Sequence, residues 1–180
     1  DKCVADVAGK RLSYVDLCDV DSLTSFWLTS EVMRNEIGSG STYMYKDIDA
    51  PIHFGPVWDF DYGSDSVAPF GSSSAVSWAS NGRWWFSEIM KDPYFAVKAR
   101  ELYLDKEDTL KETVKENGTL DRWHDYIEES GIKNQQRWHY SRGFEEDNKA
   151  LKSWLNKRFN WMDKQFASDA STMESMHVNL

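Results

Sequence analysis

The chain has 180 residues, of which 41% are hydrophobic and 28% are charged, so it is long enough to form one domain with a buried core. Its 30 acidic and 21 basic residues give a net charge of −9, which argues against nucleic acid and anionic membranes as partners because both require cationic faces. No apolar run approaches the roughly 18 residues of a membrane span. Residues 1–10 lack the basic start and apolar core of a signal peptide, and the start at Asp1 suggests a piece of a longer chain.

The first half of the sequence predicts one helix followed by a β-hairpin. Asp19 and Ser22 are typical helix caps, and apolar residues then recur at helical spacing as far as Met33. Residues 1–15 carry little pattern. The expected elements are a helix at about 21–34, strands at 42–45 and 53–58 joined by a turn at 47–50, and a long surface loop at 64–82.

The second half is predicted to be helical almost to its end. The expected helices lie at 84–90, 94–104, 106–116, 119–129 and 144–166. The last of these has a one-sided apolar face with Asn148 as its single polar break. The fold class is therefore mainly α with a small β-hairpin, with a core at about 16–166 and a polar, flexible tail at 167–180.

The segment 34–63 concentrates the residues that could carry chemistry. Glu36 and Ser41 stand five positions apart, which is the spacing of the catalytic Asp and the metal-binding Asn in a protein-kinase loop. The predicted hairpin follows, and Asp59 and Asp61 come directly after it. Phosphoryl transfer needs carboxylates that hold Mg²⁺ on the nucleotide phosphates and one that orients the acceptor hydroxyl. Asp59, Asp61 and Ser41 could supply the hard oxygen ligands that Mg²⁺ prefers.

A plainer interpretation of the same residues stays open at this point. Acidic residues at the end of a strand are more often turn formers or solvated side chains than ligands. Glu36, close to a helix end, is compatible with a simple surface charge.

Several ordered motifs resemble the spore-coat protein H (CotH) kinase-like family over about residues 16–166. The matching stretches are Ser41-Thr42-Tyr43-Met44-Tyr45-Lys46-Asp47, Gly55-Pro56-Val57-Trp58-Asp59-Phe60-Asp61-Tyr62-Gly63, Trp84-Trp85-Phe86, Met90-Lys91-Asp92-Pro93-Tyr94-Phe95, Phe144-Glu145-Glu146, Leu151-Lys152-Ser153-Trp154-Leu155-Asn156-Lys157-Arg158 and Trp161-Met162-Asp163.

The resemblance implies the carboxy-terminal lobe of an atypical protein kinase that transfers phosphate from ATP to Ser or Thr of a partner protein with the help of Mg²⁺. It implies Glu36 as the catalytic base, Asp59 and Ser41 as residues that bind the cofactor, and Asp61 as a further metal ligand. It also implies a bacterial, extracellular or cell-surface setting such as a cellulosome-type assembly. The match begins almost at Asp1, so the nucleotide-gripping lobe is expected to be missing, and the chain alone is expected to bind ATP poorly and to be inactive.

One departure from the family pattern concerns the catalytic position, where the family commonly has Asp and this chain has Glu36. Glu is one methylene longer, and misplacement by about 1 Å can cost about a hundredfold in rate.

Two other functions remain as alternatives to phosphotransfer. One is a catalytically silent interaction or scaffold module in such an extracellular assembly. The other is a sugar-binding module in which Trp78, Trp84 and Trp85 form an aromatic platform. Cys3 and Cys18 could pair in an exported protein or stay as small buried side chains.

Overall fold

The structure is a computed structural model of the whole chain, and it describes residues 4–7, 10–35, 42–61, 63–64, 74–80, 86–139 and 142–178, with only the backbone for 4–7, 10 and 11. This part of the chain is mainly helical and contains two small antiparallel sheets. The prediction of a mainly α fold with a small β-hairpin is therefore confirmed at this level.

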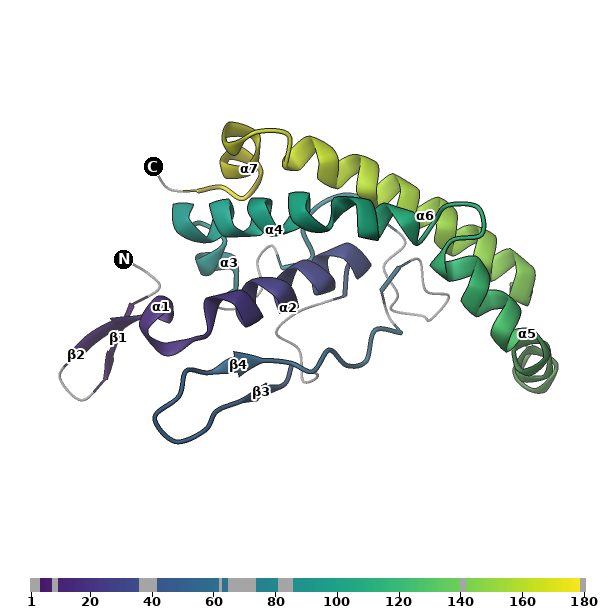
Figure 1. Cartoon of the computed structure of the whole chain (residues 1–180), viewed down its shortest axis with the longest axis horizontal. Helices are drawn as coiled ribbons and strands as arrows, with labels where there is room; N and C mark the ends of the chain where they lie inside the picture. The colour runs from purple at the N-terminus through teal and green to yellow at the C-terminus, as the bar shows by residue number, and fades with distance from the viewer. Residues whose placement is uncertain are drawn as a thin grey trace.

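Eleven elements follow one another along the described ranges. The strands are β1 (Val4–Val7), β2 (Lys10–Ser13), β3 (Met44–Tyr45) and β4 (His53–Phe54). The helices are α1 (Tyr14–Leu17), α2 (Val20–Met33), α3 (Phe86–Ile89), α4 (Pro93–Glu112), α5 (Thr119–Trp138), α6 (Phe144–Gln165) and α7 (Asp169–Ser175). Helices α2, α4 and α6 run along the length of the molecule, and α5 lies at one end of it (Figure 1).

Helix α2 is the central element, and its sequence explains why. The side chain of Asp19 accepts a hydrogen bond of 2.7 Å from the Ser22 amide, which satisfies one of the free N–H groups at the start of the helix. Leu23, Phe26 and Trp27 are buried, and the helix contacts both α4 and α6. Eight of its 14 residues are buried, because a helix covered on two sides buries more than a single stripe of its surface.

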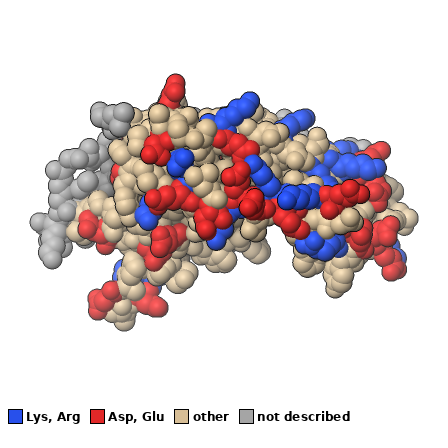
Figure 2. All heavy atoms as spheres, turned by 45° about the horizontal axis from the view of Figure 1, so that its top comes forward, with Lys and Arg blue, Asp and Glu red and all other residues tan. Residues whose placement is uncertain are grey.

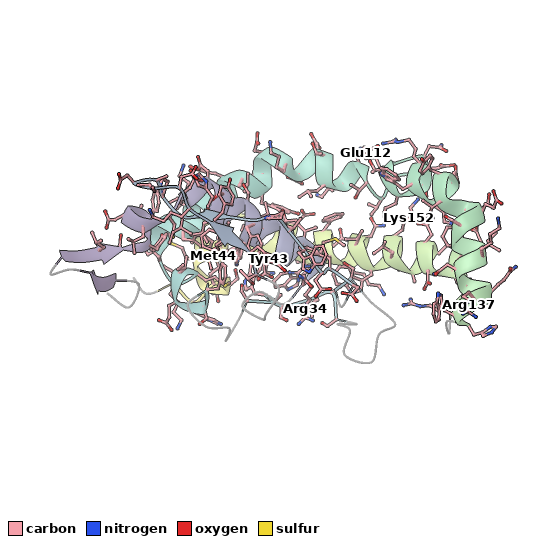
Figure 3. The ribbon with its side chains drawn as sticks, turned by 90° about the horizontal axis from the view of Figure 1, so that it is seen from below. Arg34, Tyr43, Met44, Glu112, Arg137 and Lys152 are labelled. Carbon is pink, nitrogen blue, oxygen red and sulfur yellow. The ribbon has the colours of Figure 1, made fainter. Side chains whose placement is uncertain are left out.

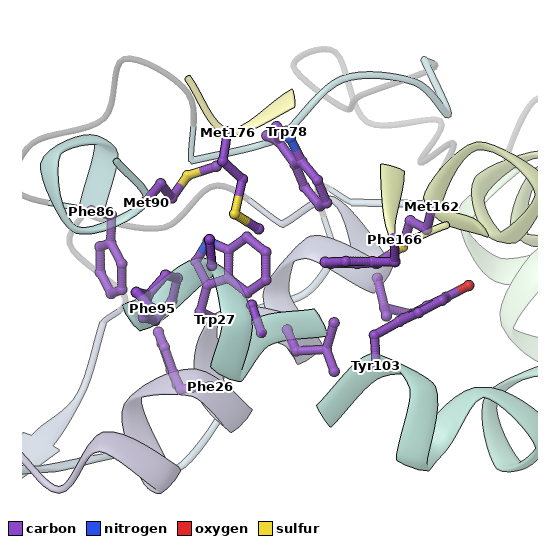
Figure 4. Close-up of a cluster of buried hydrophobic side chains, with 14 of the residues drawn as sticks. Phe26, Trp27, Trp78, Phe86, Met90, Phe95, Tyr103, Met162, Phe166 and Met176 are labelled. Atoms are coloured by element: carbon purple, nitrogen blue, oxygen red, sulfur yellow. The ribbon is translucent and has the colours of Figure 1, made fainter. Parts of the chain in front are cut away.

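The core is built around aromatic side chains (Figure 4). The ring of Trp27 lies 5.3 Å from that of Trp78 and 5.4 Å from that of Phe95, with the second pair edge to face. Trp78 in turn lies 5.4 Å from Phe166. Such pairs each add about 0.5–1.5 kcal/mol beyond the burial of their area. The chain segment at 74–80 is therefore held in the core although it has no regular secondary structure.

A buried ion pair ties the end of α2 to α6. The guanidinium of Arg158 donates to the Glu31 carboxylate at 3.1 Å, and both side chains are fully buried. The Glu31 carboxylate also accepts from the amides of Ala79 at 2.7 Å and Ser80 at 2.8 Å. Burial lowers the pKa of Arg158 to about 10 even though Glu31 opposes the shift, so the guanidinium stays protonated at neutral pH. Charged buried groups are tolerated only with this degree of hydrogen bonding.

Five details differ from the sequence-based predictions. The strand expected at 53–58 ends at Phe54. The helices expected at 94–104 and 106–116 form one helix, α4, because no Gly or Pro interrupts them. Helix α5 continues through Gly131, where the Phe144 ring occupies the space of a side chain, and ends at Trp138. The expected polar tail forms α7, in which Thr172 is buried. The weakly patterned start pairs as β1 with β2.

Candidate functional site

Of the four residues predicted to form the site, the structure describes two. Asp59 and Asp61 follow β4, and both side chains are exposed to solvent. Glu36 and Ser41 lie outside the described residues. That the four side chains meet is therefore still a prediction. The structure describes the segment that carries Asp59 and Asp61, and it describes the chain as far as Asn35, the residue before Glu36.

The segment that carries Asp59 and Asp61 runs alongside α2 and is attached to it at both ends. At the start of α2, the Asp19 amide donates to the Ile52 carbonyl at 2.9 Å, and the Phe54 amide donates to the Ser22 hydroxyl at 3.2 Å. At the end of α2, the Ser64 amide donates to the Met33 carbonyl at 2.9 Å. The loop that carries Asp59 and Asp61, which we call the acidic loop, is thereby attached to the start and to the end of α2.

The second attachment is close because residue 63 is a glycine. A Cβ at Gly63 would lie 2.5 Å from the Met33 carbonyl oxygen and 3.5 Å from the Asn35 amide nitrogen. The Ser64 hydroxyl adds a hydrogen bond of 3.0 Å to the same carbonyl. Asn35 is the residue before Glu36 in the chain. The segment after Asp61 thus contacts the backbone that leads into Glu36.

The backbone at Asp59 adopts a left-handed conformation, with φ of 64°. This region is uncommon for residues other than glycine, and Asp and Asn tolerate it better than most because their short side chains bond locally. Strand β4 has already ended at Phe54, so Asp59 lies in irregular backbone beyond the hairpin.

Aromatic side chains flank the acidic loop on the solvent side of the hairpin. The ring of Tyr43 lies 6.4 Å from that of Trp58, edge to face, and Trp58 is 58% exposed. Tyr45 stacks on His53 at 5.1 Å. Phe54, on the other face of the hairpin, is buried against α2. Figure 3 labels Tyr43, which directly precedes β3, Met44 on β3, and Arg34 at the end of α2.

The described residues do not by themselves form a complete metal site. Within the described ranges, no group of three or more His, Cys, Asp and Glu side chains is arranged to hold an ion. Mg²⁺ nevertheless often binds through one or two protein carboxylates and keeps several waters. Asp59 and Asp61 are hard oxygen donors open to solvent, so they suit that mode of binding.

An apolar pocket of about 410 Å³ lies between α2, α4 and α6 and includes Met33 in its wall. Leu28, Leu102, Leu151 and Phe159 are among its other lining residues. Nothing in the order of these residues along the sequence signals the pocket, because it forms between three helices that are far apart in the chain.

The sugar-binding platform predicted from Trp78, Trp84 and Trp85 is wrong for Trp78. Trp78 is only 4% exposed, and its indole N–H donates to the Ser175 carbonyl at 3.1 Å. A ring enclosed in the core cannot stack on a sugar. Trp84 and Trp85 lie outside the described residues.

Cys3 also lies outside the described residues, so its pairing with Cys18 stays a prediction.

The surface charge agrees with the composition. On the face drawn in Figure 2, acidic and basic side chains alternate, with acidic ones in excess. Within the described ranges, we find no helix with the length and apolar character that a bilayer crossing requires.

Comparison of the chain with models of known protein families, with curated protein sequences and with solved structures found no match.

Proposed function

We propose that the chain is the helical lobe of a metal-dependent protein phosphotransferase of the CotH kinase-like type. The donor would be ATP, and the acceptor would be a Ser or Thr hydroxyl of a partner protein. The single observation that supports this proposal is the attachment of Gly63 and Ser64 to Met33, because it brings the segment after Asp61 to the backbone just before Glu36.

The proposed roles follow from the chemistry of the side chains. A divalent cation at this place would neutralise charge on the nucleotide phosphates. Asp59 is proposed as its main ligand, with Asp61 and Ser41 in support. Glu36 is proposed as the general base that accepts the proton of the acceptor hydroxyl.

The position of Asp59 and Asp61 favours a ligand role over a purely structural one. A carboxylate that serves only as a turn former needs no fixed relation to another helix. Here the loop is anchored at Ser22 and at Met33, and its carboxylates still face solvent. Anchoring of this kind positions a side chain for a ligand that comes from outside.

A titration with Mn²⁺, followed by electron paramagnetic resonance of the free ion, tests the proposal. We expect the chain to bind Mn²⁺ and Asp59→Asn to weaken the affinity at least tenfold. The matched control is Asp47→Asn, another exposed carboxylate, which lies in the turn between β3 and β4 and should leave the affinity unchanged. Equal binding by the parent and by Asp59→Asn would contradict the proposal and favour the scaffold-module alternative.

A further inference from the structure

Helix α5 presents an apolar face that none of the described residues covers. None of its 20 residues is buried, although it contains three aromatic side chains with large exposed fractions. Trp123 is 59% exposed, Tyr126 80% and Trp138 61%, and Ile127 adds an exposed aliphatic side chain beside them. Exposed apolar groups that gather on one surface mark an interaction site.

Trp123, Tyr126, Ile127 and Trp138 share one side of the helix. Trp123, Tyr126 and Ile127 are spaced by three and four positions, and such residues are neighbours on a helix surface. The rings of Trp123 and Tyr126 meet edge to face at 5.6 Å. Ser130 lies one turn further along, and its hydroxyl donates to the Ile127 carbonyl at 2.8 Å. We call these five residues, Trp123, Tyr126, Ile127, Ser130 and Trp138, the α5 face.

A different side of α5 holds the helix on α6. The His124 ring stacks on Phe144 at 4.4 Å, and the Lys152 ammonium pairs with Asp121 at 2.6 Å. Gly131 accommodates the Phe144 ring. In Figures 1 and 3, α5 lies at the far end of the molecule, and Arg137 is seen at the extremity. Among the described residues, the contacts that hold α5 on α6 therefore leave the α5 face uncovered.

We propose that the α5 face binds the same face of a second copy of this chain, with the two helices antiparallel and the two-fold axis at Ser130. The pattern of residues is self-complementary about that position. Trp123 and Arg137 stand equally far from Ser130 on its two sides. An antiparallel pair therefore places an arginine of each copy opposite a tryptophan of the other, in the isologous manner of a two-fold dimer.

Charge and size support this arrangement. Arg137 already lies 5.2 Å from its own Trp138 ring, so the cation–π contact that the dimer would use exists within one copy. Glu129 and Lys133 form an ion pair within one copy, so the two-fold axis brings no unpaired charge of theirs against the partner. At the centre, Ser130 is small and its hydroxyl already has an acceptor, so the helices can approach closely without burying an unsatisfied group.

The dimer should be weak. An aromatic side chain buries about 150–250 Å² when fully covered, so the six aromatic residues of two copies would bury on the order of 800 Å² given their present exposure. Stable complexes bury about 1,200–2,000 Å², and the aliphatic parts of the neighbouring residues supply only part of the difference. We therefore expect an interface of the weak, transient class, which forms only at a high concentration of the chain.

Sedimentation equilibrium of the full chain between 1 and 200 µM tests the proposal. The chain should change from monomer to dimer over this range, and Trp123→Glu should remain a monomer throughout. The matched control is Trp58→Glu, which changes a tryptophan of nearly equal exposure in the segment after β4 and should still dimerise. Both variants should keep the circular dichroism spectrum and melting temperature of the parent, because both side chains lie outside the core.

Cysteine cross-linking tests the position of the axis. With Cys3 and Cys18 replaced by Ala, Ser130→Cys should form a disulfide-linked dimer, whereas Gln136→Cys, which lies on another side of α5, should not. The proposal is overturned if the chain stays monomeric at 200 µM, if Trp123→Glu dimerises like the parent, or if both cysteines cross-link equally. A monomer that instead binds lipid vesicles through Trp123 would also overturn it and assign the α5 face to a membrane surface.

Discussion

Replacement of Arg158 by Met removes one partner of the buried ion pair and leaves the other in place. In the parent, Arg158 donates to the Glu31 carboxylate and to the carbonyls of Glu31, Ala75 and Ser77, at distances of 2.7–3.2 Å. Met fills a similar volume without any donor. The Glu31 carboxylate would keep only the contacts from residues 79 and 80, and three carbonyls, two of them in buried contacts, would lose a donor.

The expected cost is about 3–5 kcal/mol in the free energy of unfolding, which is the range for a buried charge that loses its partner. For a chain of this size, about 2–4 °C is lost per kcal/mol, so the melting temperature should fall by about 6–20 °C. Arg158→Lys keeps the charge but not the fork of donors, and it should cost less than Arg158→Met.

Urea unfolding followed by tryptophan fluorescence measures the change. The control is Lys133→Met, which removes the cation of an exposed pair with Glu129 and should change the free energy of unfolding by about 0.5 kcal/mol or less. If Arg158→Met unfolds within 1 kcal/mol of the parent, the ion pair does not hold the end of α2 against α6, and the reasoning about its role is refuted.

Three further predictions concern single contacts. Gly63→Ala should weaken Mn²⁺ binding severalfold without removing a carboxylate, because the new methyl group would press on the Met33 carbonyl and displace the acidic loop; the same paramagnetic titration measures it. Gly131→Ala should destabilise the fold by about 1–3 kcal/mol in urea unfolding, because overlap with the Phe144 ring outweighs the gain of about 1 kcal/mol in helix propensity. With Asp121→Asn, the free energy of unfolding should depend less on pH under acidic conditions. The midpoints of urea unfolding between pH 2 and 6 measure this dependence.

The sign of the last effect follows from the pKa of Asp121. A hydrogen bond from the Lys152 ammonium lowers this pKa below its ordinary value. The contact therefore stabilises the fold fully above the unfolded pKa, near 3.9, and the contribution is lost as the pH falls through the lower folded pKa. The asparagine variant lacks this contribution at every pH, so its acid limb should be shallower than that of the parent.

Each of these predictions has a result that would contradict it. Unchanged Mn²⁺ affinity in Gly63→Ala would separate the acidic loop from the contact with α2. A more stable Gly131→Ala would mean that the Phe144 ring moves aside freely. Parallel acid limbs for Asp121→Asn and the parent would show that the link between α5 and α6 is not electrostatic.

Local signals in the sequence predicted the elements that depend on local interactions. The cap at Asp19 and the apolar spacing after it locate α2 to within a residue at each end. The helix expected from Tyr94 begins one residue earlier, at Pro93, after an Asp92 cap whose side chain accepts from the Tyr94 amide. Both signals act through groups only a few residues apart, so the sequence alone contains them.

Features that depend on distant residues could not be predicted in the same way. Gly131 looks like a helix stop until the Phe144 ring is known to cover it. Trp78 looks exposed because Ser and Gly residues precede it, yet the rings of Trp27 and Phe166 enclose it.

The same distinction between local and distant contacts applies to the candidate site. The identity and order of Asp59 and Asp61 can be obtained from the sequence, together with the hairpin that precedes them. The contact of Ser64 with Met33 joins residues 31 positions apart, and no periodic pattern announces it. The convergence of Glu36 and Ser41 with these carboxylates stays a prediction.

The most direct test of the proposed metal site is paramagnetic broadening of backbone amide signals by substoichiometric Mn²⁺. Broadening falls steeply with distance from the ion, so it locates the site without any assumption about activity. We predict that the signals of residues 58–64 and those of Arg34, Asn35 and Glu36 broaden first and together, and that Asp59→Asn removes the effect. Broadening that begins at Asp47 and Asp49 or along α5, and leaves residues 34–36 sharp, would contradict the proposed site.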